Sequence, residues 1–282
     1  MAYIDSIFAA AGLGLSLAAC AHSAWCLFRP CRHADNVPLV LLGATAMSLL
    51  ALLSIHALET GRVPAFGSLE ALSFYAVTVI AAHLYMAIRH QMHGLTAILS
   101  PYIAIVIVLA ITTTGQAVDV PIDAGHLSVT LHVTAAFLAY AFCTTAGVLG
   151  VAYLIQDRNL KHKHFGATFQ RLPTLELLDH QMARQIGGAF LMLTLAGAFG
   201  VHLVLLRGDA AEWATDPKIV ATAITWGIYA VLMHMRTGGC RHGRGMAALT
   251  IMGLLFLLFS FLGIHLLANS VHHFVLPGEG AI

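Results

Sequence analysis

The chain has 282 residues, of which 59% are hydrophobic and only 10% are charged, whereas soluble domains contain roughly 25% charged residues. Together with a mean hydropathy of +0.83, this composition excludes a soluble enzyme and a disordered chain, because too few charged side chains are present to keep the surface in water. The low charged fraction also excludes a nucleic-acid-binding protein, which needs a basic face, whereas the net charge of +1 says nothing about partners. An integral membrane protein remains.

Eight stretches are apolar and long enough to cross a bilayer, which takes about 20 helical residues. None of them has the alternation of apolar and polar residues that marks a membrane β-strand. We therefore predict an all-α, polytopic membrane bundle with about eight transmembrane helices, in a single integral membrane domain over residues 1–282. In chain order, the predicted spans are 4–28, 37–58, 68–88, 95–114, 131–156, 184–206, 217–235 and 245–268.

The positively charged residues predict the orientation of these spans, because Lys and Arg accumulate in cytoplasmic loops. The opposite side has only three Lys or Arg residues, which lie in the even-numbered loops or at the edge of a span: Arg62, Arg207 and Lys218. We therefore expect both termini to be external and the protein to be a multi-pass protein of the inner (plasma) membrane. The other Lys and Arg lie in or beside the odd-numbered loops: Arg29, Arg32, Arg89, Arg158, Lys161, Lys163, Arg171, Arg184, Arg236, Arg241 and Arg244.

Histidine is unusually frequent, with 17 residues against 14 Lys and Arg together. Polar side chains are costly inside a bilayer and are usually functional there. The predicted orientation places His56, His132 and His272 towards the external side, and His83 and His234 in the inner half of the membrane. Neutral imidazoles on separate apolar helices suit the axial positions of a haem whose ring is buried between helices. No CxxCH motif for covalent haem attachment occurs.

Two other kinds of histidine site fit the sequence less well. A zinc site favours thiolate ligands or a His-x-x-x-His pair on one helix, and no span contains such a pair. A proton relay needs Asp or Glu to alternate with His. The acids that we identify for such a relay are only Glu70, inside the third span, and Glu59, at the edge of the second.

Four short motifs follow one another along the chain. His56 precedes a turn and the sequence Gly-Ser-Leu-Glu70, and a Leu-His132-Val-Thr sequence opens the fifth span. The segment from Trp213 to Lys218, with the sequence WATDPK, leads into the span of His234, and the last span is followed by His272. In this order the motifs resemble the cytochrome c assembly superfamily of membrane haem-handling proteins, which includes CcsA-type subunits of cytochrome c synthases and HemX-like proteins.

The resemblance implies that His132 and His272 hold the iron of one haem b at the external face, beneath a tryptophan-rich loop. It also implies that His234 is the haem-iron ligand within the membrane. In this chain the loop has a single tryptophan, Trp213, so the aromatic platform that stacks on a porphyrin is reduced. We therefore expect a haem-binding protein that presents haem externally, either as a non-catalytic subunit or as one that depends on a partner membrane subunit of a haem-attachment system. His56 and His83 are further candidate cofactor-binding residues.

Two other functions remain open at this point. A membrane b-type cytochrome that transfers electrons would also place haems in two layers, but its paired histidines are expected on the same two helices. A structural or regulatory membrane subunit of the HemX-like kind would use its histidines for packing.

The predicted orientation can be tested with reporter fusions. A reporter fused after Arg241 is expected in the cytoplasm and one fused after Ile282 outside it, because basic residues are retained on the cytoplasmic side. The measurement is the activity of paired reporters that work on only one side of the membrane. A cytoplasmic signal from the fusion after Ile282 would contradict the orientation.

Overall fold

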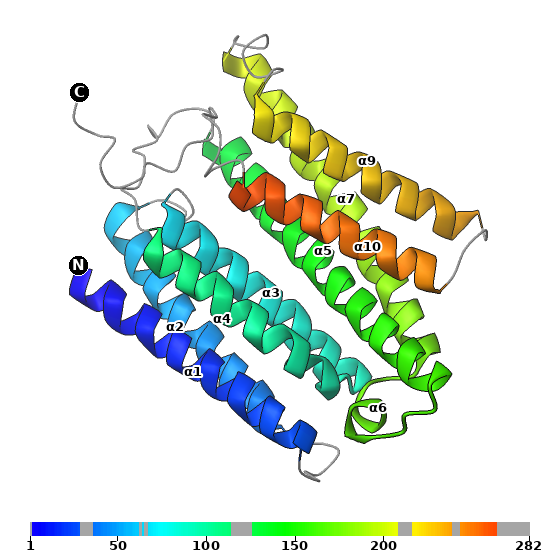
Figure 1. The fold of residues 1–282 in the computed structure, drawn as a ribbon. Coiled ribbons are helices and arrows are strands. Elements are labelled where there is room, and N and C mark those ends of the chain that lie inside the picture. Colours follow the sequence, from blue (N-terminus) through cyan, green and yellow to red (C-terminus); the bar gives the residue numbers. More distant parts are fainter. Residues whose placement is uncertain are drawn as a thin grey trace. The chain divides into compact units, whose positions relative to one another are not determined.

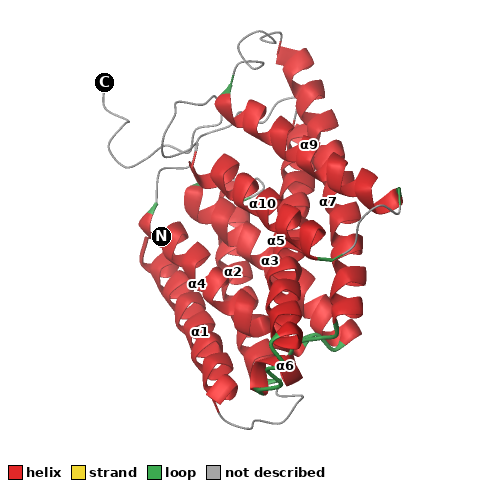
Figure 2. Ribbon diagram, turned by 45° about the vertical axis from the view of Figure 1, so that its right-hand side comes forward, coloured by secondary structure: helices red, strands yellow, loops and turns green. Residues whose placement is uncertain are grey.

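The computed structural model describes residues 2–28, 36–61, 64, 67–113, 126–207, 216–238 and 243–263. These residues form helices joined by loops, and no strand occurs among them (Figure 2). Eight helices in this part of the chain are long and apolar enough to span a membrane. The prediction of an all-α, multi-pass membrane protein is thus confirmed, whereas the external position of the termini stays a prediction.

The chain forms two compact units. Helices α1–α4 belong to the first unit and helices α9 and α10 to the second, while α5 and α7 each contribute to both. The single domain over residues 1–282 stays a prediction.

The first unit is a bundle of four helices, α1 (Ala2–Phe28), α2 (Val37–Thr60), α3 (Ser68–His90) and α4 (Thr96–Thr112), with the short helix η1 (His93–Leu95) before α4. Each helix packs against the next and α4 packs against α1, which closes the bundle (Figure 1). Its centre is filled by fully buried side chains such as Leu49, Ile80 and Ile103. Helix α2 ends at Gly61, whose φ of 65° is the left-handed conformation that glycine adopts without a steric cost.

The second unit is formed by α5 (His126–Lys161), α7 (Leu175–Arg207), α9 (Pro217–Thr237) and α10 (Arg244–Leu258), which continues into the π-helical turn η2 (Phe259–Gly263). Glycines allow these helices to approach closely, as small residues commonly do in membrane bundles. The close contacts are those of Gly147 on α5 with Leu254 on α10, Gly188 on α7 with Phe142 on α5, and Gly253 on α10 with Tyr229 on α9.

Two helices differ in extent from the predicted spans. Helix α5 has 36 residues and α7 has 33, whereas we predicted 131–156 and 184–206. The added turns are polar, with an ion pair between Lys161 and Asp157 at 3.0 Å and Glu176 in the first turn of α7. An α-helix forms its backbone hydrogen bonds internally, in water as well as in lipid. It can therefore continue past the end of the apolar stretch that hydropathy detects. The segment between them contains the short helix α6 (Ala167–Arg171).

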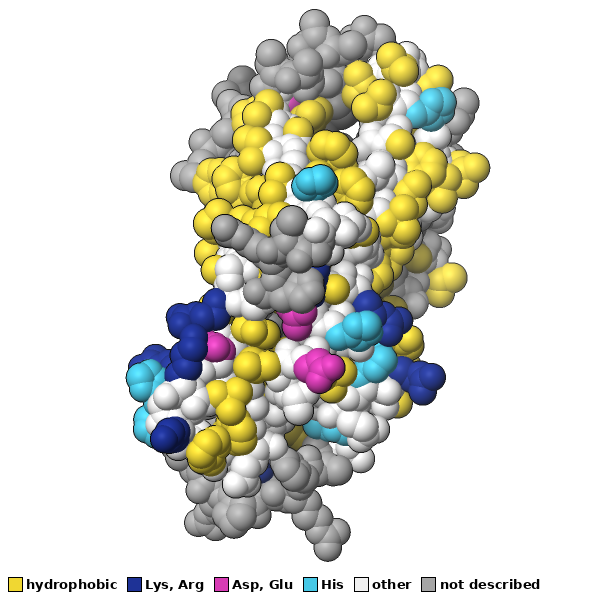
Figure 3. Space-filling view, turned by 90° about the vertical axis from the view of Figure 1, so that its right-hand side faces the viewer, with side chains coloured by type: hydrophobic (Ala, Val, Ile, Leu, Met, Phe, Trp, Pro, Cys, Tyr) yellow, Lys and Arg dark blue, Asp and Glu magenta, His cyan; other side chains and the backbone are white. Residues whose placement is uncertain are grey.

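The described helices expose wide apolar areas on their surfaces. On the face drawn in Figure 3, hydrophobic side chains form a broad surface, and Lys and Arg side chains gather away from it. Large apolar side chains such as Val220, Ile224 and Val231 of α9 are exposed. Such side chains are expected to face lipid, because the hydrocarbon core is as apolar as they are.

The contact between α5 and α10 can be tested by Gly147→Ala. A Cβ at this position would lie 2.4 Å from Leu254 Cδ2 and 2.9 Å from Leu254 Cβ, so the two helices would have to separate. We expect the free energy of unfolding in detergent to fall by about 1–3 kcal/mol. The matched control is Gly187→Ala on α7, where no atom lies within 4 Å of the new Cβ and alanine favours the helix. Equal stability of the two variants would contradict the packing.

Candidate functional site

His132 lies near the start of α5 and its ring faces α7. Its Nδ1 is 2.8 Å from the carbonyl oxygen of Ala196. A carbonyl oxygen only accepts hydrogen bonds, so Nδ1 carries the proton and donates it, and in the neutral ring the lone pair is then on Nε2. Metal-ligating histidines usually have this arrangement, in which the second nitrogen is held by a carbonyl or a carboxylate.

Gly200, one turn after Ala196 on α7, makes room for this ring. A Cβ at Gly200 would lie 3.2 Å from Cε1 and 3.3 Å from Nδ1 of His132. Helix α7 therefore supplies both the acceptor that orients the imidazole and the space that the imidazole occupies. Any side chain at Gly200 would push the ring away from the Ala196 carbonyl.

A cation and two aromatic rings accompany His132 at this end of the second unit. Asp216 caps the N-terminus of α9, where its carboxylate accepts a hydrogen bond of 2.8 Å from the backbone N–H of Lys218. The Lys218 ammonium lies within electrostatic range of His132 and 6.0 Å from the ring centroid of Phe261. Phe261 packs edge-on against Tyr140, with 5.1 Å between ring centroids. Positive charge thus occurs near His132, and two packed aromatic rings adjoin the residue that carries this charge.

His272 and Trp213 lie outside the described residues. Their expected roles, as the second external ligand and as the aromatic cap, therefore stay predictions.

The two inner histidines have different surroundings. His83, on α3 in the first unit, is fully buried, and its Nε2 is 2.9 Å from the hydroxyl oxygen of Thr96. The side chain of His234, on α9 in the second unit, is exposed. Their roles as haem ligands stay predictions.

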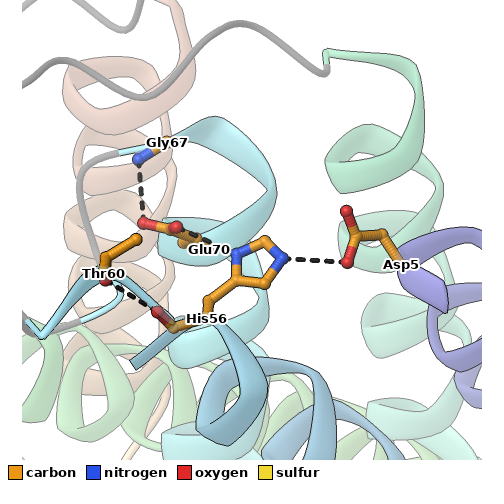
Figure 4. A network of polar contacts seen from close by, with 5 residues as sticks. All are labelled: Asp5, His56, Thr60, Gly67 and Glu70. Atoms are coloured by element: carbon orange, nitrogen blue, oxygen red, sulfur yellow. Dashed lines mark hydrogen bonds and ion pairs between the residues drawn. The ribbon is translucent and has the colours of Figure 1, made fainter. Parts of the chain in front are cut away.

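His56 lies between two carboxylates (Figure 4). Its Nδ1 is 2.9 Å from Oε1 of Glu70 on α3, and its Nε2 is 2.9 Å from Oδ1 of Asp5 on α1. Neither ring nitrogen is open to an iron in this arrangement. The expected role of His56 as a cofactor-binding residue stays a prediction, and ligation of an iron would require one of these two contacts to break.

Asp5 was not among the predicted site residues, although it lies within the predicted span 4–28. It is separated from His56 by 51 positions, so no local pattern connects the two residues. The carboxylates of Asp5 and Glu70 contact opposite sides of the imidazole and do not converge on one point. Among the described residues, no group of three or more His, Cys, Asp or Glu side chains is placed to hold a metal ion.

Comparison with known proteins identifies the family. Residues 65–272 match the family model described as Cytochrome C assembly protein. The chain belongs to this family. The match covers His83, His132 and His234 and ends at His272, whereas Asp5 and His56 precede it.

Several relatives are cytochrome c biogenesis proteins named CcsA. The one from Guillardia theta is 23% identical over 264 residues, which cover 85% of this chain and 86% of the relative. The one from Nymphaea alba is 24% identical, and the match covers 82% of this chain and 83% of the relative. The one from Synechococcus sp. (strain JA-3-3Ab) is 25% identical, and the match covers 83% of each chain. No solved structure matches. The resemblance to the cytochrome c assembly superfamily is thus confirmed.

The protonation of His132 can be tested in the haem-free protein by NMR with ¹⁵N-labelled histidine. At about pH 8, where an unperturbed imidazole is neutral, we expect the proton of His132 on Nδ1, because the Ala196 carbonyl accepts it. The resonance is assigned by its loss in His132→Gln, and exposed His234 serves as the comparison. A proton on Nε2 of His132 would contradict the orientation of the ring.

Proposed function

We propose that this protein binds haem b and presents it at the external face of the membrane for cytochrome c assembly, with His132 and His272 as axial ligands. The observation that carries the proposal is the hydrogen bond from His132 Nδ1 to the Ala196 carbonyl, which leaves Nε2 available in the neutral ring. A haem iron takes one neutral imidazole nitrogen at each axial position. His272 would supply the second nitrogen.

The surroundings of His132 support a ligand that is both apolar and acidic. Haem combines a large apolar ring with two carboxylates, so it requires apolar contacts and a cation at the same site. The Lys218 ammonium supplies positive charge near His132 and lies 6.0 Å from the centroid of the Phe261 ring, which packs against Tyr140. Trp213 would add one further ring to the loop before α9.

His234 is proposed as the ligand of a haem in the inner half of the membrane. Its exposed side chain is accessible to a second ligand from a partner chain, and His83 and His22 are the alternatives within this chain. Thr96 already contacts Nε2 of His83, so ligation by Nε2 would require that hydrogen bond to break.

A partner subunit of the cytochrome c assembly system would complete the external site, because one tryptophan makes a smaller stacking platform than several. We therefore propose a partner-dependent or non-catalytic subunit of the inner membrane. When bound, the haem supplies the iron porphyrin that such a system attaches to its cytochrome.

The ligand role of His132 can be tested with His132→Gly. Loss of one axial nitrogen is expected to change a six-coordinate bis-histidine spectrum to a five-coordinate or water-ligated one, and added imidazole is expected to restore the parent spectrum by filling the space. His272→Gly should behave in the same way. A parent spectrum in both variants without imidazole would overturn the assignment.

Gly200→Ala tests whether α7 orients the His132 ring for haem binding, without removal of the His132 side chain. The new methyl group would crowd Cε1 and Nδ1 of the ring, so we expect weaker haem binding, partial rescue by imidazole and a preserved fold. Gly197→Ala, on the same helix, meets no atom within 4 Å and should bind haem like the parent. Equal haem affinity in both variants would show that α7 does not position the ligand.

A further inference from the structure

Three helix ends in the first unit bring together a group of side chains that the haem proposal does not use. Asp5 lies in the first turn of α1, His56 near the end of α2 and Glu70 in the first turn of α3. We propose that these three residues form a proton-transfer site, in which the His56 imidazole carries a proton between the Asp5 and Glu70 carboxylates. This proposal is independent of haem binding.

The geometry is that of a relay. Each ring nitrogen of His56 is 2.9 Å from one carboxylate oxygen (Figure 4). The exposed fraction of the side chain falls from 22% for Asp5 to 15% for His56 and 6% for Glu70. Asp5 is thus the residue most open to solvent, and Glu70 is the buried end of the path.

The hydrogen bonds fix how many protons the group shares. A nitrogen lone pair facing an ionised oxygen would be repulsive, so each of the two contacts needs one proton. Transfer starts with protonated Asp5 facing the Nε2 lone pair and with Nδ1–H facing ionised Glu70. The Asp5 O–H bond breaks as Nε2–H forms, and Nδ1–H breaks as the Glu70 O–H bond forms. The imidazole changes tautomer, the number of protons is conserved and no heavy atom has to move.

Both carboxylates lie at the N-terminal end of a helix. Each is in the first turn of a helix, where the helix dipole favours negative charge. Glu70 is also held in place, because its Oε2 accepts a hydrogen bond of 3.2 Å from the backbone N–H of Gly67. The proton therefore moves between two groups of the same chemical type, each in the first turn of a helix.

Few other titratable groups lie on the helices that surround the site. Glu59, the other acid of α2, is exposed. Helix α4 carries no Asp, Glu, His, Lys or Arg, and α1 has no acid besides Asp5. The next titratable residue along α3 after Glu70 is Tyr75, which contacts Tyr102. Among the described residues, the hydrogen bonds thus trace a route from Asp5 through His56 to Glu70.

The test follows protonation of Glu70 in time-resolved infrared spectra after a rapid drop in pH. It uses the full chain in lipid nanodiscs, without haem and with ¹³C-labelled glutamate. The carbonyl band of protonated Glu70 is assigned by its loss in Glu70→Gln. In Asp5→Asn and in His56→Gln we expect this band to appear about a hundredfold more slowly, which is the lower end of what a positioned proton-transfer group contributes. Glu59→Gln is the matched control and should keep the parent rate.

Two results would overturn the proposal. The first is a parent rate of Glu70 protonation in Asp5→Asn or in His56→Gln, which would reduce the group to a structural ion network. The second is the absence of any band that Glu70→Gln removes. The unfolding temperature of each variant is measured first. If His56→Gln does not fold, Asp5→Asn still decides the question, because its amide retains a hydrogen-bonding group beside His56 at the more exposed end of the site.

Discussion

A polar side chain within a membrane bundle has no bulk water to bind, so it must find its hydrogen-bond partner inside the protein. This constraint accounts for the hydrogen-bond partners of three histidines in the described part of the chain. His132 donates to the Ala196 carbonyl, His83 contacts the Thr96 hydroxyl, and His56 lies between two carboxylates. In each case the partner decides which ring nitrogen remains available, and hence what the imidazole can do.

The consequences differ between His132 and His56. A carbonyl is neutral and accepts one proton, so it leaves the opposite nitrogen of His132 with a lone pair suited to a metal. Two carboxylates occupy both nitrogens of His56, which suits the movement of protons and not the binding of iron. The same residue type, at the ends of helices in two different units, is therefore proposed to serve two different chemistries.

The sequence is most informative where structure follows from local composition. Hydropathy sums over neighbouring residues, so all eight spans could be predicted. The order of four short motifs, around His56, His132, Trp213 and His272, indicated the family. The polar ends of α5 and α7 could not be predicted in this way, because both helices extend beyond their apolar stretches. The hydrogen-bond partners of the histidines could not be predicted from the sequence either. Ala196 lies 64 positions from His132 and offers only a backbone carbonyl, and Asp5 lies 51 positions from His56.

The central claim is that this chain is a haem-binding member of the cytochrome c assembly family. The most direct measurement is the reduced-minus-oxidised optical spectrum of the detergent-purified parent protein, combined with pyridine haemochrome quantification. The account predicts non-covalently bound haem b with a six-coordinate, bis-histidine spectrum. A protein that is folded but contains no haem, and takes up none when haem is added, would contradict it.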